Sequence, residues 1–155
     1  MNNFKDNFVA DPHALARAVG AVMYERDTGV QTLGIRLEEI SPGYARMTMA
    51  VRPDMLNGHG ICHGGFIFTL ADSAFAYACN SGNRNTVASG CAIEFLAPGT
   101  QGDVLQAEAV EQSRTGKTGV YDITITNQDG KRIALFRGKS YQIRGEIISD
   151  PAGER

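Results

Sequence analysis

The sequence lacks features that define several classes of protein. It contains three cysteines, an odd number at unrelated spacings (residues 62, 79 and 91), which favours reduced thiols over a disulfide framework. No basic head followed by an apolar run opens the chain, so we expect no signal peptide. The longest apolar stretch, 66–79, is shorter than the roughly 20 residues that cross a bilayer and carries Asp72 in its middle. These absences predict a cytoplasmic protein with no membrane-spanning segment.

A large excess of either charge is also missing, because the formal net charge is −2. The charges are nevertheless unevenly distributed, with a balance of −5 over residues 1–113 and +5 over residues 114–144. A local basic region on an acidic chain favours a small anionic ligand over long nucleic acid. The alternative, that these charges lie solvated on strand faces, stays open.

The hydrophobic pattern predicts a single α+β domain over residues 1–155. Asp11 and Pro12 are typical of a helix start, and apolar residues at helical spacing extend that helix over about 12–27. Residues 64–81 are apolar nearly all round, which indicates a helix buried on every side. Strand-like runs are expected at 33–37, 45–51, 86–96, 104–112, 119–127 and 133–143. Short turns join most of them, so we predict a curved antiparallel sheet around the apolar helix, with a frayed tail from about residue 145.

Asp72 is the only formally charged residue between Gly64 and Ser81. Removing a carboxylate from water costs free energy, so an aspartate is rarely buried unless a partner or a function offsets that cost. One interpretation is structural, with the carboxylate satisfied by a neighbouring hydroxyl or a buried arginine. The other is a desolvated base or nucleophile. The spacing alone does not decide between them.

His63, Gly64 and Gly65 stand at the predicted start of the same helix. Free backbone N–H groups and the positive end of the helix dipole point outward there, which suits a phosphate or a carbonyl oxygen that gains negative charge. Gly64 and Asp72 are eight residues apart, or about 12 Å along one helix. A carbonyl held at Gly64 must lie within roughly 3–3.5 Å of its attacking group. Two antiparallel helices related by a two-fold axis satisfy both conditions, so we predict at least a dimer with shared sites.

A metal site, a cysteine nucleophile and a P-loop are each weakly supported by the sequence. His59, Cys62 and His63 offer three possible metal ligands within five residues, but no fourth ligand is evident and we expect no metal. Cys62 as a nucleophile has no assured base, so a small buried thiol is favoured. The loop 113–118 contains residues that suit phosphate but does not match the P-loop spacing.

The stretch 57–65 (NGHGICHGG), followed by Leu70-Ala71-Asp72, resembles the signature of hotdog-fold acyl-CoA thioesterases. Three further stretches, 73–81, 116–123 and 134–140, resemble the phenylacetate-degradation (PaaI-type) branch of that family. The similarity runs from about residue 12 to 144. It implies a central helix held by a curved antiparallel sheet, two subunits that join their sheets, and a homotetramer built from two such dimers.

The resemblance also implies roles for individual residues. Asp72 would be the base or nucleophile, Gly64 would supply the oxyanion-hole amide, Asn57 would orient water or the carbonyl, and His63 would support them. Related enzymes often carry a hydroxyl one turn after the acid, whereas this chain has Ala76. The candidates for binding the CoA phosphates are Arg114, Lys117, Arg137 and Lys139.

The implied reaction is hydrolysis of an aryl-acyl-CoA thioester, of the phenylacetyl or hydroxyphenylacetyl type, with no cofactor and no nucleic-acid or membrane partner. Two alternatives stay open. A hotdog-fold dehydratase would need His63 or His59 to reach the acidic carbon of the substrate. In a non-catalytic module that binds acyl-CoA or an aromatic ligand, Asp72 would be purely structural.

Overall fold

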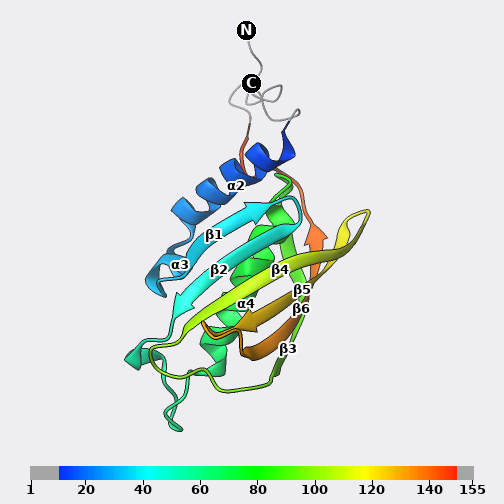
Figure 1. The fold of residues 1–155 in the computed structure, drawn as a ribbon. Helices are drawn as coiled ribbons and strands as arrows, with labels where there is room; N and C mark the ends of the chain where they lie inside the picture. Colours follow the sequence, from blue (N-terminus) through cyan, green and yellow to red (C-terminus); the bar gives the residue numbers. More distant parts are fainter. Residues whose placement is uncertain (1–10, 150–155) are drawn as a thin grey trace.

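The computed structural model describes residues 11–149, which form one sheet and the helices packed against it (Figure 1). In chain order the elements are α2 (Pro12–Arg26), α3 (Thr28–Thr32), β1 (Arg36–Ser41), β2 (Tyr44–Ala50), the 3-10 turn η1 (Pro53–Met55), α4 (Gly64–Asn80), β3 (Thr86–Phe95), β4 (Val104–Thr115), β5 (Thr118–Thr126) and β6 (Arg132–Gln142).

The six strands lie in the order β1-β2-β4-β5-β6-β3, and every neighbouring pair is antiparallel. β3 follows α4 directly in the chain but pairs with β6, so it forms one edge of the sheet. The sheet wraps around α4 (Figure 1). This arrangement confirms the predicted α+β class and the predicted central helix.

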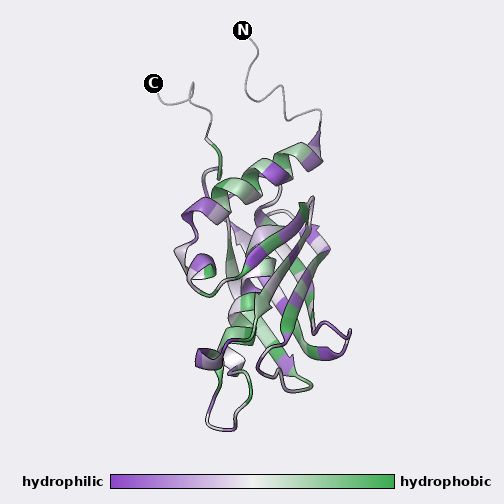
Figure 2. Ribbon diagram, turned by 60° about the vertical axis from the view of Figure 1, so that its left-hand side comes forward, coloured by the Kyte–Doolittle hydropathy of each residue, from purple (hydrophilic) through white to green (hydrophobic). Residues whose placement is uncertain are grey.

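α4 is buried because nearly all of its surface is apolar. Leu70, Phe75 and Tyr77 are at most 1% exposed, and Figure 2 shows the helix mostly in hydrophobic colours beneath the sheet. Gly138 on β6 allows the helix to approach the sheet closely. A Cβ built at Gly138 would lie 2.8 Å from three ring atoms of Phe75. A side chain at this position would therefore push α4 away from the sheet.

The amino-terminal helix begins where the sequence predicts. The Asp11 carboxylate caps it by accepting hydrogen bonds from the backbone N–H groups of His13 and Ala14, at 3.0 and 3.1 Å. Its end differs slightly from the prediction, because Asp27 caps a second short helix, α3, through the N–H of Val30. The first strand consequently begins at Arg36 rather than at residue 33.

The tail also differs from the expected fraying at residue 145. The backbone N–H of Ile148 donates to Oδ1 of Asn83 at 2.8 Å, and the Asn83 amide donates back to the Ile148 carbonyl at 3.1 Å. This reciprocal pair attaches the chain as far as Ile148, and the rest of the predicted tail, 150–155, lies outside the described residues. Within residues 11–149, no helix has both the length and the apolar character needed to span a membrane.

Candidate active site

Asp72 lies partly buried on α4, beside the edge strand β3. Its closest polar neighbour is the thiol of Cys91 on β3, with Sγ 3.9 Å from Oδ1. Burial raises the pKa of Asp72, and the hydrogen bond from Cys91 partly opposes that rise. Across residues 11–149, no arginine or lysine forms an ion pair with Asp72 and no hydroxyl donates to it. The expected structural partners are therefore missing from the described chain, which favours a carboxylate held ready to take up a proton.

The start of α4 leaves one backbone donor available. His63 is the N-cap residue, and its Nδ1 accepts a hydrogen bond from the Gly65 N–H at 3.0 Å. The His63 N–H donates to the Met55 carbonyl at 2.8 Å. The Gly64 N–H between them has no hydrogen-bond acceptor among the described residues. His63 thus fixes the first turn, and Gly64 presents the free N–H.

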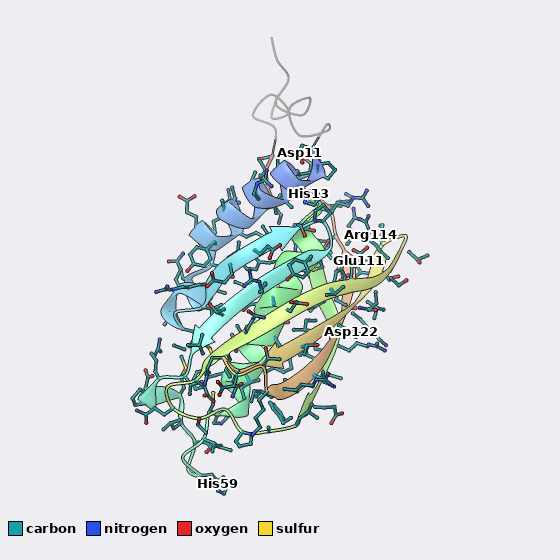
Figure 3. All side chains as sticks on the ribbon, viewed as in Figure 1. Asp11, His13, His59, Glu111, Arg114 and Asp122 are labelled. Carbon is teal, nitrogen blue, oxygen red and sulfur yellow. The ribbon has the colours of Figure 1, made fainter. Side chains whose placement is uncertain are left out.

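Asn57 shapes the loop that leads into α4. Its side-chain oxygen accepts from the backbone N–H groups of His59 and Ile61, at 2.9 and 3.4 Å. Its own N–H donates to the Ile61 carbonyl at 2.8 Å. The carbonyl end of the Asn57 amide is therefore committed to the loop, and its NH₂ group is the end that can face a ligand. His59 lies at the exposed tip of this loop, far from α4 (Figure 3).

The metal interpretation finds no support in the described part of the chain. No group of three His, Cys, Asp or Glu side chains there is arranged to hold an ion. Cys62 is buried, and its burial raises the pKa of the thiol. A buried thiol with a raised pKa is a poor nucleophile. Cys62 is thus the small buried residue that the sequence favoured.

Gly64 and Asp72 do not meet within one chain, because they lie eight residues apart on the same helix. Asp72 instead faces the side of α4 that β3 flanks. Eight of the ten residues of β3 are exposed, including the apolar Val87 and Phe95 at 44% and 53%. A long edge strand with exposed apolar side chains is a surface that natural proteins normally cover.

The four basic candidates fall into two groups. Arg114 and Lys117, beside the turn between β4 and β5, line a cavity of about 140 Å³ at the carboxyl end of α4. Arg84 lines the same cavity, although it lies outside the basic region 114–144 and no sequence signal marked it. Glu111 shares the cavity and accepts a hydrogen bond from the Tyr121 hydroxyl at 2.7 Å. Glu111 and Arg114 project from neighbouring positions at this end of the sheet (Figure 3).

Arg137 and Lys139 lie elsewhere, on β6. Both occupy exposed positions of β6 that alternate with the buried Phe136 and Ser140, so they point away from α4. The Arg137 guanidinium binds both carboxylate oxygens of Asp122, at 2.7 and 2.8 Å. This contact raises the pKa of Arg137 and lowers the pKa of Asp122. Alternation along β6 is the sequence signal that could have separated these two residues from the helix side.

Comparison with known proteins places these features in a family. Residues 59–134 match the model of the thioesterase superfamily. The chain is 52% identical over 128 residues to the acyl-coenzyme A thioesterase PaaI of Escherichia coli (strain K12), covering 83% of this chain and 91% of that protein. The solved structure of the E. coli PaaI protein from the phenylacetic acid degradation operon superposes with a TM-score of 0.85 at 50% identity, over 86% of this chain and 97% of that one. A hypothetical thioesterase from Streptococcus pneumoniae TIGR4 with coenzyme A gives a TM-score of 0.69 at 28% identity, over 72% and 90%.

Proposed function

Because the chain belongs to the thioesterase superfamily, has its hotdog fold and is an acyl-CoA thioesterase, we propose that Asp72 is the carboxylate that drives hydrolysis. The observation that carries this proposal is the setting of Asp72. It is a partly buried carboxylate with a raised pKa and a single weak thiol donor among the described residues. A carboxylate desolvated in this way is a stronger base or nucleophile than one in water.

The Gly64 N–H is the proposed oxyanion donor. It stands at the positive end of α4 with no acceptor among the described residues, and it would stabilise the negative charge that develops on the thioester oxygen. In one route Asp72 takes a proton from water, the hydroxide adds to the carbonyl carbon, and the carbon–sulfur bond breaks to release CoA thiolate. In the other route Asp72 attacks the carbonyl carbon itself, the carbon–sulfur bond breaks to release CoA thiolate and leave a mixed anhydride, and water then hydrolyses the anhydride to the free acid and the Asp72 carboxylate. Both routes remain part of the proposal.

The site is proposed to be shared between two subunits. Gly64 of one chain would face Asp72 of a second chain if two α4 helices packed antiparallel, with their β3 edges joined. The exposed, apolar edge at β3 supports this pairing, because a second β3 would satisfy its free backbone groups and cover apolar side chains along the strand such as Val87. A homotetramer of two such dimers completes the proposed assembly.

His63 and Asn57 have supporting roles in this scheme. His63 holds the first turn of α4 by accepting the Gly65 N–H, which keeps the Gly64 N–H directed outward. The NH₂ group of Asn57 would orient the attacking water or the carbonyl. The dehydratase alternative is disfavoured, because it needs a histidine base. Nδ1 of His63 already serves as the helix cap, and His59 lies at the exposed tip of its loop.

The cavity lined by Arg84, Arg114 and Lys117 is the proposed site for the CoA phosphates. Three cations and one carboxylate, Glu111, line this cavity, and the excess of positive charge would attract phosphate groups more strongly than isolated surface charges. Arg114 lies 3.9 Å from Glu111, a longer contact than the two-point pair of Arg137 with Asp122. Arg137 is a weaker candidate because its guanidinium already binds Asp122, and Lys139 lies on the same outward face.

The proposed acyl group is an aryl-acetyl group. Phe68 lies partly buried one turn before Asp72, and its ring meets that of Phe136 edge-on at 5.2 Å. Aromatic side chains of this kind favour an aromatic ligand. The E. coli protein from the phenylacetic acid degradation operon is a relative with the same fold. Three free cysteines support the proposed cytoplasmic location.

Release of free CoA thiol from a panel of esters tests the role of Asp72 and the choice of acyl group together. The panel consists of acetyl-, phenylacetyl-, 4-hydroxyphenylacetyl- and decanoyl-CoA. Asp72→Asn should lower kcat by about 100-fold or more, whereas Asp129→Asn, on an exposed turn, should not. Retention of a tenth of the parent kcat by Asp72→Asn would contradict the assigned role. A parent enzyme that prefers decanoyl-CoA would contradict the aryl preference.

Subunit mixing tests the shared site. Co-refolded chains carrying Asp72→Asn and Gly64→Pro should regain about half of the parent activity per mixed dimer, since one of the two sites has both groups intact. Proline at the first helical position retains the helix start and removes the N–H, but its side chain also displaces the Phe95 ring, which lies 2.9 Å from a Cβ built at Gly64. Gly64→Ala, which displaces the same ring and keeps the N–H, is therefore the matched control for the Gly64→Pro chain. The reverse control mixes the parent chain with a chain that carries both Asp72→Asn and Gly64→Pro, and a mixed dimer with shared sites should then be inactive. If each chain instead held a complete site, that mixed dimer would keep half of the activity.

A further inference from the structure

Phe95, the last residue of β3, lies directly against the start of α4. A Cβ built at Gly64 would lie 2.9, 3.2 and 3.4 Å from the three outermost ring atoms of Phe95. The ring therefore occupies the space in which any residue other than glycine at position 64 would place its side chain. The proposed oxyanion donor and this aromatic edge are immediate neighbours in one chain.

The ring is not buried by this contact, because Phe95 is 53% exposed. A phenylalanine that packs on a helix and still exposes half of its surface leaves an apolar face available for something else. The outer edge of the ring meets the position of Gly64, which is where a carbonyl group would be held. The substituents of that carbonyl carbon must therefore pass close to the Phe95 ring.

The strand β3 contacts α4 at the two proposed reactive groups, and Phe95 supplies one of these contacts. Cys91 and Phe95 are four residues apart on the strand, about 13 Å at 3.3 Å per residue. Gly64 and Asp72 are separated by about 12 Å along α4. Cys91 meets Asp72 and Phe95 meets Gly64, so β3 brings one side chain to each of the two proposed reactive groups.

We propose that Phe95 determines acyl-group specificity, by forming the apolar wall on which the acyl group lies while the Gly64 N–H holds its carbonyl oxygen. This inference rests on the proposed function, since it places the carbonyl at Gly64. The ring offers contact area to an acyl group with a flat aromatic or an extended alkyl portion, and it offers almost none to an acetyl group. Losing it should reduce turnover of large acyl groups selectively.

The test compares Phe95→Ala and Phe95→Leu with Leu96→Ala. Leu96 is the next residue after β3, is 51% exposed, and is not among the nearest neighbours of a Cβ built at Gly64, so it is a matched control for loss of an apolar side chain at this edge. kcat/KM is measured for phenylacetyl-, decanoyl- and acetyl-CoA, at protein concentrations where sedimentation velocity shows the same assembly for all chains.

Phe95→Ala should lower the phenylacetyl-to-acetyl ratio of kcat/KM by about tenfold, and Phe95→Leu by less, whereas Leu96→Ala should leave it within twofold. A ratio in Phe95→Ala within twofold of the parent would overturn the inference, as would an equal change in Leu96→Ala. If the parent itself prefers decanoyl-CoA, the aryl proposal fails. Phe95 is then judged by the decanoyl-to-acetyl ratio, so the two failures are distinguishable.

Discussion

Gly138→Ala should destabilise the fold through one defined contact. The added Cβ would lie 2.8 Å from three ring atoms of Phe75, whereas ordinary contacts begin near 3.4 Å, so the strand and the ring must separate by about 0.6 Å. Neither can move freely. Phe75 is 1% exposed and its ring packs against Tyr121 and Phe136 at 5.5 and 6.2 Å. Gly138 pairs with strands on both sides.

Overpacking of this kind costs about 1–3 kcal/mol. For a chain of 155 residues, a loss of about 2 kcal/mol lowers Tm by roughly 4–8 °C. Urea unfolding at one fixed protein concentration measures the loss of free energy of unfolding. Gly82→Ala is the control, because a Cβ there meets nothing within 4 Å, and it should change the free energy by no more than about 0.5 kcal/mol.

A double-mutant cycle shows whether Phe75 causes the loss. Phe75→Leu removes the ring atoms that the new methyl group would meet, so the double variant should be more stable than the sum of the two single changes predicts, by about 1 kcal/mol. Strict additivity would refute the reasoning. So would a Gly138→Ala protein within about 0.5 kcal/mol of the parent.

Three further predictions concern charges. Cys91→Ala removes the hydrogen bond that lowers the pKa of Asp72, so the acid limb of the pH profile of kcat/KM should move to higher pH. Cys91→Ser should keep that limb in place, and an unmoved limb in Cys91→Ala would contradict the prediction. Burial raises the pKa of Asp72, so the ionised carboxylate destabilises the fold at pH values above that pKa. Asp72→Asn should therefore raise Tm at neutral pH. This gain in Tm should shrink as the pH falls toward about 3.9, the pKa of an aspartate in the unfolded chain. Arg137→Gln should leave KM for the CoA esters within twofold, because Arg137 is already bound to Asp122 on the outward face; a fivefold rise would show that it contacts CoA.

Features that depend on neighbouring residues in the chain could be predicted from the sequence. Asp11 and Pro12 predicted the helix start, and the apolar stretch after Gly64 predicted a buried helix. The order of strands and short turns predicted the antiparallel sheet. The spacing of Gly64 and Asp72 on one helix was sufficient to predict that one chain does not bring them together.

The remaining features depend on pairing between strands that are distant in the chain. The spacing of hydrophobic residues indicates which face a residue occupies, but it does not indicate which strand lies beside it. The return of β3 to the edge beside β6 places Cys91 at Asp72 and Phe95 at Gly64. The same topology brings Arg84 to the cavity of Arg114 and Lys117, from a segment some thirty residues earlier in the chain.

The sequence by itself thus determined the fold class and the helix that carries the proposed reactive groups, since both follow from local hydrophobic pattern. It also supplied Asp72 as a candidate carboxylate. Only the tertiary structure decided what surrounds that carboxylate. The burial that raises its pKa, the thiol beside it and the aromatic wall at Gly64 all arise from contacts between α4 and β3, and such contacts depend on sheet order and register.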